Sequence, residues 1–122
     1  MYLSVGDARL NGEREMIATV WTNGNTELGV KISAKDRDQF FKKEWSYVIL
    51  ELEGLPYPVD VNVRKQSFWR WPYAVLTHLE LGDWLTGNGL SHWPPRKPPK
   101  LTLEPIGPRR FRLSRRRNVV PE

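Results

Sequence analysis

The sequence predicts a mostly β (α+β) fold, best arranged as a seven-stranded open β-barrel with two short helices. Apolar and polar residues alternate in several short segments, which is the pattern of strands with one buried face. Clusters of glycine, asparagine and proline separate these segments as hairpin turns would. About seven short strands in a chain of this length are too many for one flat sheet, and a barrel removes most exposed edges. A mixed α+β sandwich is the second architecture that this pattern allows.

The strands are expected where apolar side chains recur at every second position. The clearest example is residues 59–64, where three valines alternate with polar residues. The same alternation predicts strands over residues 16–21, 30–32, 47–53, 101–103 and 111–113. Residues suited to turns lie between them, at positions 22–25, 54–56 and 105–108.

The first short helix is expected over residues 33–43. Ser33 and Asp36 have the spacing of a capping box, in which a serine hydroxyl accepts a hydrogen bond from the first helical turn. A helix that begins there turns Phe40 and Phe41 toward the interior.

The second helix is expected over residues 77–87. Thr77 and Glu80 form a stronger capping box, the following apolar residues have helical spacing, and Gly87 can end the helix. The proline-rich residues 94–99 cannot pair as a central strand, so we expect an extended connection there.

The composition excludes several classes of protein. With 122 residues the chain has room for one compact domain, and without cysteine it can hold neither disulfides nor a thiolate zinc site. No apolar run approaches the roughly 20 residues of a membrane-spanning helix, and the first residues lack the pattern of a secretion signal. We expect a soluble, cytoplasmic protein with a domain over residues 15–114, an N-terminal extension over 1–14 and a basic tail or linker over 115–122.

Positive charge is concentrated at the C-terminal end of the sequence. Residues 1–93 hold ten Lys and Arg against twelve Asp and Glu, whereas residues 94–122 hold nine against two. Such a basic block is typical of proteins that bind a polyanion, because phosphate contacts release condensed counterions. A solvated tail explains the arginines of residues 115–117 about as well.

The sequence offers little for catalysis. His78 and His92 do not have the spacing of metal ligands, and there is neither a strained serine elbow nor a glycine-rich phosphate loop. Glu51, Glu53 and Asp60 lack the arrangement of a metal-dependent nuclease, so we interpret them as solvent-facing strand residues. We therefore expect no catalytic residue, no metal and no cofactor.

The most informative segment is residues 64–73, which combine three cations, two polar side chains and four aromatic rings directly after a strand. Arginine can bond the guanine edge, glutamine the adenine edge, and lysine a phosphate. The alternative is that the aromatic rings belong mainly to the core. We expect two of the four rings to be buried and Arg70 to be exposed. A second polar segment, residues 21–28, offers asparagine and threonine side chains for similar contacts, although a plain hairpin turn explains them equally well.

The order of these elements resembles the plant B3-type DNA-binding pseudobarrel, particularly the B3-like effector domain of some restriction endonucleases. The resemblance runs from about Glu15 to Leu113 and covers both polar segments, the Gly29–Ser33 strand, the helix with two phenylalanines and the Leu79–Leu85 helix. It implies a recognition module without its own catalytic centre that binds specific duplex DNA with two arms in the major groove and that can precede a nuclease domain in a longer parent chain. We expect the module itself to be a monomer. The arms would be residues 21–28 and 64–73. The arginine-rich end and residues 94–99 have no place in the family pattern.

On the basis of this resemblance we predict roles for individual residues, and two of these residues, Arg96 and Lys97, lie outside the family pattern. Base readout falls to Asn23, Asn25, Arg64, Gln66 and Arg70, and phosphate anchoring to Lys31, Lys65, Arg96 and Lys97. The full set of expected DNA-binding residues adds Trp21, Thr26, Ser67, Trp69, Trp71 and Tyr73.

Three other functions fit the same sequence. An RNA- or single-strand-binding barrel would stack bases on Trp69, Trp71 and Tyr73. A small toxin-type ribonuclease would use His78 or His92 as its general base. A protein-interaction module would present residues 94–99 to an aromatic groove.

Overall fold

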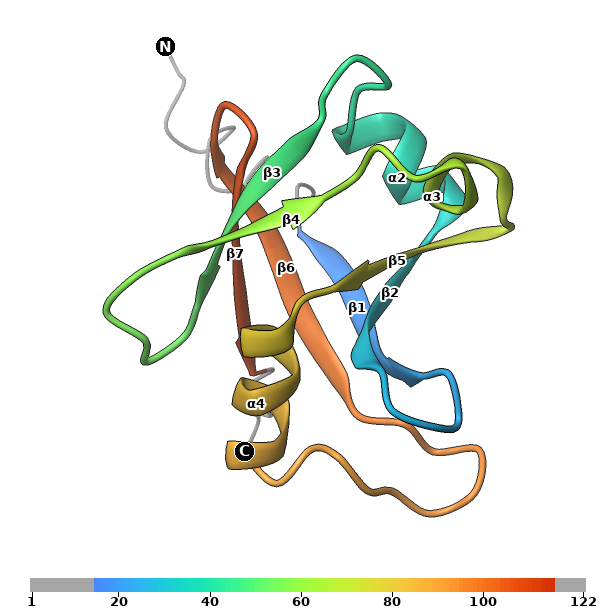
Figure 1. Ribbon diagram of the computed structural model, residues 1–122, viewed down its shortest axis with the longest axis vertical. Coiled ribbons are helices and arrows are strands. Elements are labelled where there is room, and N and C mark those ends of the chain that lie inside the picture. The colour runs from blue at the N-terminus through green and yellow to red at the C-terminus, as the bar shows by residue number, and fades with distance from the viewer. Residues whose placement is uncertain (1–14, 116–122) are drawn as a thin grey trace, which may run out of the picture.

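The computed structural model describes residues 15–115, which form a nearly closed seven-stranded β-barrel with three short helices (Figure 1). The strands are β1 (Met16–Thr22), β2 (Leu28–Ser33), β3 (Tyr47–Leu52), β4 (Val59–Asn62), β5 (Tyr73–Thr77), β6 (Lys100–Gly107) and β7 (Arg110–Arg115). The helices are α2 (Ala34–Phe40), α3 (Gln66–Arg70) and α4 (Leu79–Gly87). The mostly β barrel predicted from the sequence is confirmed.

The strands form one sheet in the order β4-β3-β7-β6-β1-β2-β5. All neighbours are antiparallel except β3 and β7, which run parallel. The two edge strands, β4 and β5, contact each other and nearly close the sheet into a barrel. The parallel pair has a consequence for charge, because it places the arginines of β7 beside Glu51 of β3 and beside Glu53, which directly follows this strand.

The core follows the predicted alternation along each strand. On β4, Val59 and Val61 are buried while their polar neighbours are exposed, and β1, β3, β6 and β7 show the same pattern. One end of the barrel is filled by aromatic rings: Phe41 stacks on Phe111 with 4.6 Å between centroids and meets Phe68 edge-on at 5.4 Å. Helices α2 and α3 lie together at this end, and α4 lies at the other (Figure 1).

The start of α2 confirms the first capping box. The Ser33 hydroxyl accepts a hydrogen bond from the Asp36 backbone N–H at 3.1 Å. The helix ends at Phe40, three residues before the expected end, because Phe41 takes an extended backbone conformation and its ring enters the core.

The expected start of the second helix is wrong by one residue. Thr77 is the last residue of β5, and the cap is His78, whose Nδ1 accepts a hydrogen bond from the Glu80 backbone N–H at 3.0 Å. An imidazole nitrogen without its proton can therefore replace the hydroxyl that we expected at this cap.

The interpretation of residues 64–73 as a loop is also incomplete. These residues contain the five-residue helix α3 and enter β5 at Tyr73. Neither element has a strong local signal, because α3 has no side-chain cap and β5 is only five residues long. Within residues 15–115, no helix has both the length and the apolar character needed to cross a bilayer. The predicted extension over residues 1–14, and the basic tail except Arg115, lie outside the described residues.

Candidate nucleic-acid interface

The outward-pointing side chains of β6, β1, β2 and β5 form one continuous surface, which we call the outer face. Strand register aligns its central row, since Thr19 pairs with Lys100 on one side and with Lys31 on the other. Paired residues point to the same side of a sheet, so these side chains are neighbours. The outer face comprises Ile17, Thr19, Trp21, Gly29, Lys31, Ser33, Tyr73, Val75, Thr77, Lys100 and Thr102.

A cation and two aromatic rings meet on the outer face. The Lys31 ammonium lies 4.9 Å from the centroid of the Tyr73 ring. The Trp71 ring meets Tyr73 edge-on at 5.8 Å and remains 43% exposed. Lys31 and two rings of residues 64–73 are therefore in one cluster, with both polar and stacking groups available to a ligand.

The far end of β5 is held close to β2 by a glycine. A Cβ atom at Gly29 would lie 2.3 Å from the Leu76 carbonyl oxygen and 2.9 Å from the Thr77 methyl group, so only glycine fits. The Lys65 ammonium lies 3.5 Å from the Thr77 hydroxyl, which brings a cation from the segment after β4 over this part of β5.

A hollow of about 510 Å³ lies on the outer face. Its lining combines Thr19, Lys31, Tyr73 and Lys100 with two carboxylates, those of Glu15 and Asp36. Hydroxyl, ammonium and carboxylate groups together provide both donors and acceptors, which is the chemistry that reading of base edges requires.

The β1–β2 loop (residues 23–27) is organised by its own side chains. The Asn23 Oδ1 atom accepts hydrogen bonds from the backbone N–H groups of Asn25 and Glu27 at 2.9 and 3.0 Å. The Thr22 hydroxyl donates to the Glu27 carbonyl at 2.8 Å. Of the Asn23 side chain, only the amide NH₂ is thus left for base readout, whereas the exposed Asn25 side chain has no hydrogen-bond partner within residues 15–115.

In the β4–β5 connection (residues 63–72), one ring is buried and a second is half-buried against the core, so the expectation of two buried rings is met only in part. Phe68 is buried, and Trp69 packs against the core with its indole N–H donating to the Val63 carbonyl at 3.0 Å. Trp71 is exposed and Tyr73 is half-buried, whereas Arg70 is exposed, as expected. The helical turn of α3 produces this division, and not the alternation that we expected. Arg64, Lys65 and Gln66 are exposed, and Ser67 is half-buried.

The β1–β2 loop and the β4–β5 connection lie at opposite ends of the β2–β5 pair. Gly29 pairs with Thr77 next to the loop, and Ser33 pairs with Tyr73 next to the connection. Six residues of β2 span roughly 17 Å at 3.3 Å per residue. The ends of the two segments that join β2 and β5 are therefore separated by the length of this pair and flank the outer face, while the Lys65 side chain of the connection reaches Thr77.

The proline-rich connection (residues 94–99) runs beside the β1–β2 loop. Its Pro99 carbonyl accepts a hydrogen bond from the Val20 backbone N–H at 2.9 Å, and Figure 1 shows the two segments side by side. Arg96 has a left-handed backbone with φ of 64°, and both it and Lys97 are exposed. Two of the predicted phosphate anchors therefore lie at the same end of the outer face as Asn25.

The arginines of β7 have a different environment. The Glu51 carboxylate receives Arg110 at 3.0 Å and Arg112 at 3.1 Å, and Glu53 accepts the Arg115 backbone N–H at 2.9 Å. Our interpretation of Glu51 and Glu53 as solvent-facing acids is incomplete, since both are half-buried and bonded to arginine. Part of the basic C-terminal block therefore stabilises the parallel strand pair.

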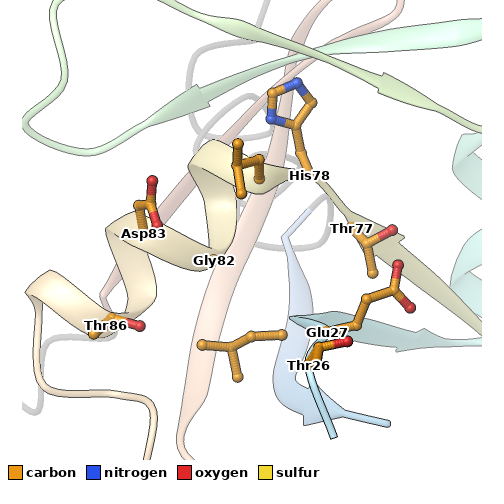
Figure 2. A pocket seen from close by; sticks show the side chains of 9 residues that line it. Thr26, Glu27, Thr77, His78, Gly82, Asp83 and Thr86 are labelled. Atoms are coloured by element: carbon orange, nitrogen blue, oxygen red, sulfur yellow. The ribbon is translucent and has the colours of Figure 1, made fainter.

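A second hollow, of about 390 Å³, separates the β1–β2 loop from α4. Figure 2 shows Thr26 and Glu27 of the loop on one side and Asp83 and Thr86 of the helix on the other. This lining contains two carboxylates and no lysine or arginine, so it does not suit a phosphate group.

The two histidine side chains have different hydrogen-bond partners. The Nδ1 atom of His78 is engaged in the α4 cap, and the Nδ1 atom of His92 lies 3.1 Å from the Ser91 hydroxyl. Within residues 15–115, no three histidine, aspartate or glutamate side chains are grouped so that they could hold a metal ion.

Several residues of the surface were not found from the sequence. Thr19, Thr77 and Lys100 join the outer face through strand pairing, although the alternation around Lys100 already marks it as outward-facing. Arg37 supports the β4–β5 connection from α2, and nothing in its local sequence distinguishes it from an exposed helical arginine. Comparison with known proteins found no family model, no curated protein and no solved structure that matches the chain.

Proposed function

We propose that this chain binds duplex DNA sequence-specifically through the outer face and the two segments at its ends. The β1–β2 loop and the β4–β5 connection read base edges with Asn23, Asn25, Arg64, Gln66 and Arg70. Phosphates contact Lys31, Lys65, Arg96 and Lys97, to which the outer face adds Lys100. The B3-like resemblance supports a role as the recognition domain of a restriction endonuclease.

The distribution of paired and unpaired cations is the observation that carries this proposal. Within residues 15–115, Arg110 and Arg112 form ion pairs with Glu51 of β3, and Arg115 forms one with Glu53, which directly follows this strand. Seven cations of the outer face and its two ends form none: these are Lys31, Arg64, Lys65, Arg70, Arg96, Lys97 and Lys100. Four others elsewhere in residues 15–115 also form none, so it is the gathering of seven on one surface that distinguishes it. Unpaired cations on one surface attract a polyanion, because neutralising its phosphates releases counterions.

The dimensions of the surface suit a duplex. The two flanking segments are separated by the β2–β5 pair, roughly 17 Å long, and a major groove is about 12 Å wide. Segments at this separation reach the two sides of the groove, while the outer face lies over the groove between them with its lysines near the flanking phosphates. The internal hydrogen bonds of the β1–β2 loop reduce the conformational entropy lost on binding.

Selection from random duplex DNA, followed by salt titration of the selected site, tests the proposal. We expect a consensus sequence and a steep decrease in affinity with salt. A double variant, Lys65→Gln with Lys100→Gln, should lower the slope of log K against log salt by about two. The control is Lys42→Gln with Lys43→Gln, which removes the same charge from the exposed connection between α2 and β3 and should leave the slope unchanged. Absence of any consensus would contradict sequence-specific recognition.

The exposed ring of Trp71 supports binding of single strands or RNA as the second candidate. An aromatic ring beside a cation can stack an unpaired base. Competition among duplex DNA, single-stranded DNA and RNA decides between the two. If single strands compete better than the selected duplex, Trp71→Ala should lower the affinity for single strands more than the affinity for the duplex.

A further inference from the structure

Arg37 is the one buried charged residue among those that the structure describes, with 7% of its surface exposed. Its Nη1 group donates hydrogen bonds to the carbonyls of Phe68 at 3.1 Å and Trp71 at 2.8 Å. Its Nε group donates to the Asp38 carboxylate at 2.9 Å, and its guanidinium lies 5.8 Å from the Trp69 ring centroid. One side chain on α2 therefore holds the backbone of the β4–β5 connection.

The short helix α3 requires such a donor. The last carbonyls of a helix have no partner within the helix, and in a five-residue helix these are most of its carbonyls. Where they are buried, they need another donor. Arg37 supplies one for Phe68 and one for Trp71, and a guanidinium can do so at two places because its N–H groups are fixed in one plane. The course of the chain at Trp71 thus depends on Arg37.

Trp71 connects this buried contact with the outer face. Its carbonyl is bonded to Arg37, and its ring contacts Tyr73, which in turn contacts the Lys31 ammonium. Arg70 immediately precedes it and is exposed at the end of α3. A change at Arg37 therefore reaches both the proposed base-reading arginine and the exposed cluster of rings.

We propose that Arg37 is a positioning residue for base selectivity, which rests on the proposed function of the outer face. Because Arg37 is buried, it does not contact the nucleic acid and neutralises no phosphate. It acts by holding Arg70 and Trp71 in the geometry that distinguishes the correct base pairs from wrong ones. Loss of Arg37 therefore affects discrimination between sites and leaves the charge-driven part of binding unchanged.

The test compares selected and mismatched duplexes for the wild type and Arg37→Met. The measured quantity is the dissociation constant for the mismatched duplex divided by that for the selected duplex. We expect this ratio to be about tenfold lower in Arg37→Met than in the wild type, as loss of a well-placed base contact would cause. The slope of log K against log salt should stay at the wild-type value, since every exposed cation remains. The indole N–H signal of Trp71 in a ¹⁵N spectrum without DNA should shift.

Two further variants separate positioning from stability. Trp84→Phe removes a hydrogen bond of 2.8 Å from a buried ring to the Glu53 carbonyl, far from the β4–β5 connection. This variant should be less stable than the wild type but should keep the wild-type ratio of dissociation constants. Arg37→Lys can donate to one carbonyl without the planar geometry, so its ratio should be intermediate. If Arg37→Met does not fold, the Arg37→Lys ratio decides.

The outcomes distinguish the two proposals. A wild type with no preference between duplexes overturns both. A selective wild type whose preference persists in the folded Arg37 variants overturns only the role of Arg37. An equal loss of preference in Trp84→Phe also overturns that role, because general loss of stability would then explain the effect.

Discussion

The Lys31 ammonium lies 4.9 Å from the centre of the Tyr73 ring, across the β2–β5 pair. The two residues are diagonal neighbours, since Lys31 pairs with Val75 and Tyr73 pairs with Ser33. A cation at this distance is attracted to the ring. The contact holds the lysine on the outer face without neutralising its charge, so the ammonium remains available to a phosphate.

Lys31→Met should weaken DNA binding and lower the salt slope by about 0.9, the value for one phosphate contact. The variant keeps most of the apolar stem, and the lost cation–π contact changes the free energy of unfolding by no more than about 1 kcal/mol. Binding titrations at several salt concentrations, with urea unfolding alongside, measure both quantities. Lys31→Arg is the control and should retain the slope. A wild-type slope in Lys31→Met would show that this lysine does not contact phosphate.

Asn23→Ala should mainly lower stability, whereas Asn25→Ala should mainly reduce discrimination between duplexes. Asn23 accepts two backbone hydrogen bonds within the β1–β2 loop, so its loss should lower the free energy of unfolding by about 1–2 kcal/mol. Asn25→Ala should leave stability within about 0.5 kcal/mol and reduce discrimination between duplexes by about 1–3 kcal/mol. Urea unfolding and paired binding assays measure the difference. Equal stability losses in both variants would contradict this division of roles.

Gly29→Ala should destabilise the protein by about 2 kcal/mol or more, because the new methyl group would lie 2.3 Å from the Leu76 carbonyl oxygen. Separation of β5 from β2 is the expected way to relieve the overlap. Gly87→Ala at the end of α4 is the matched control, since nothing lies within 4 Å of its Cβ position. That variant should be neutral or more stable by up to about 1 kcal/mol. Equal unfolding midpoints for the two variants would disprove the close approach at Gly29.

Glu51→Gln should lower the free energy of unfolding by less than about 1 kcal/mol, because both of its arginine partners are more than a third exposed. The loss should disappear near 1 M salt, where charges are screened over about 3 Å. Urea unfolding at low and high salt measures it. Preference between duplexes should be unaffected, since Glu51 lies on β3 and outside the outer face. A changed preference would place β3 in the interface.

The local pattern was sufficient for the parts of the fold that depend on neighbouring residues. Alternating valines located β4, and the spacing of Ser33 and Asp36 located the start of α2. These signals work because strand burial and helix capping act over two to four residues.

The parts that were missed depend on contacts between distant residues. Helix α3 lacks a cap of its own and is held by Arg37, some thirty residues earlier in the chain. Likewise, Glu51 meets Arg110 and Arg112 only because β3 and β7 are parallel neighbours. No local pattern reports such partners, and for this reason the sequence could suggest the two flanking segments but not their positions around the outer face.

The pairing of arginines with acids on β3 and β7 also affects how quickly the molecule can meet a charged ligand. It leaves the cations of the outer face and its two ends as charges without an ion-pair partner among the described residues. Such charges attract a polyanion before contact, so more collisions become productive. At low ionic strength the association rate constant should therefore rise more than the dissociation rate constant falls.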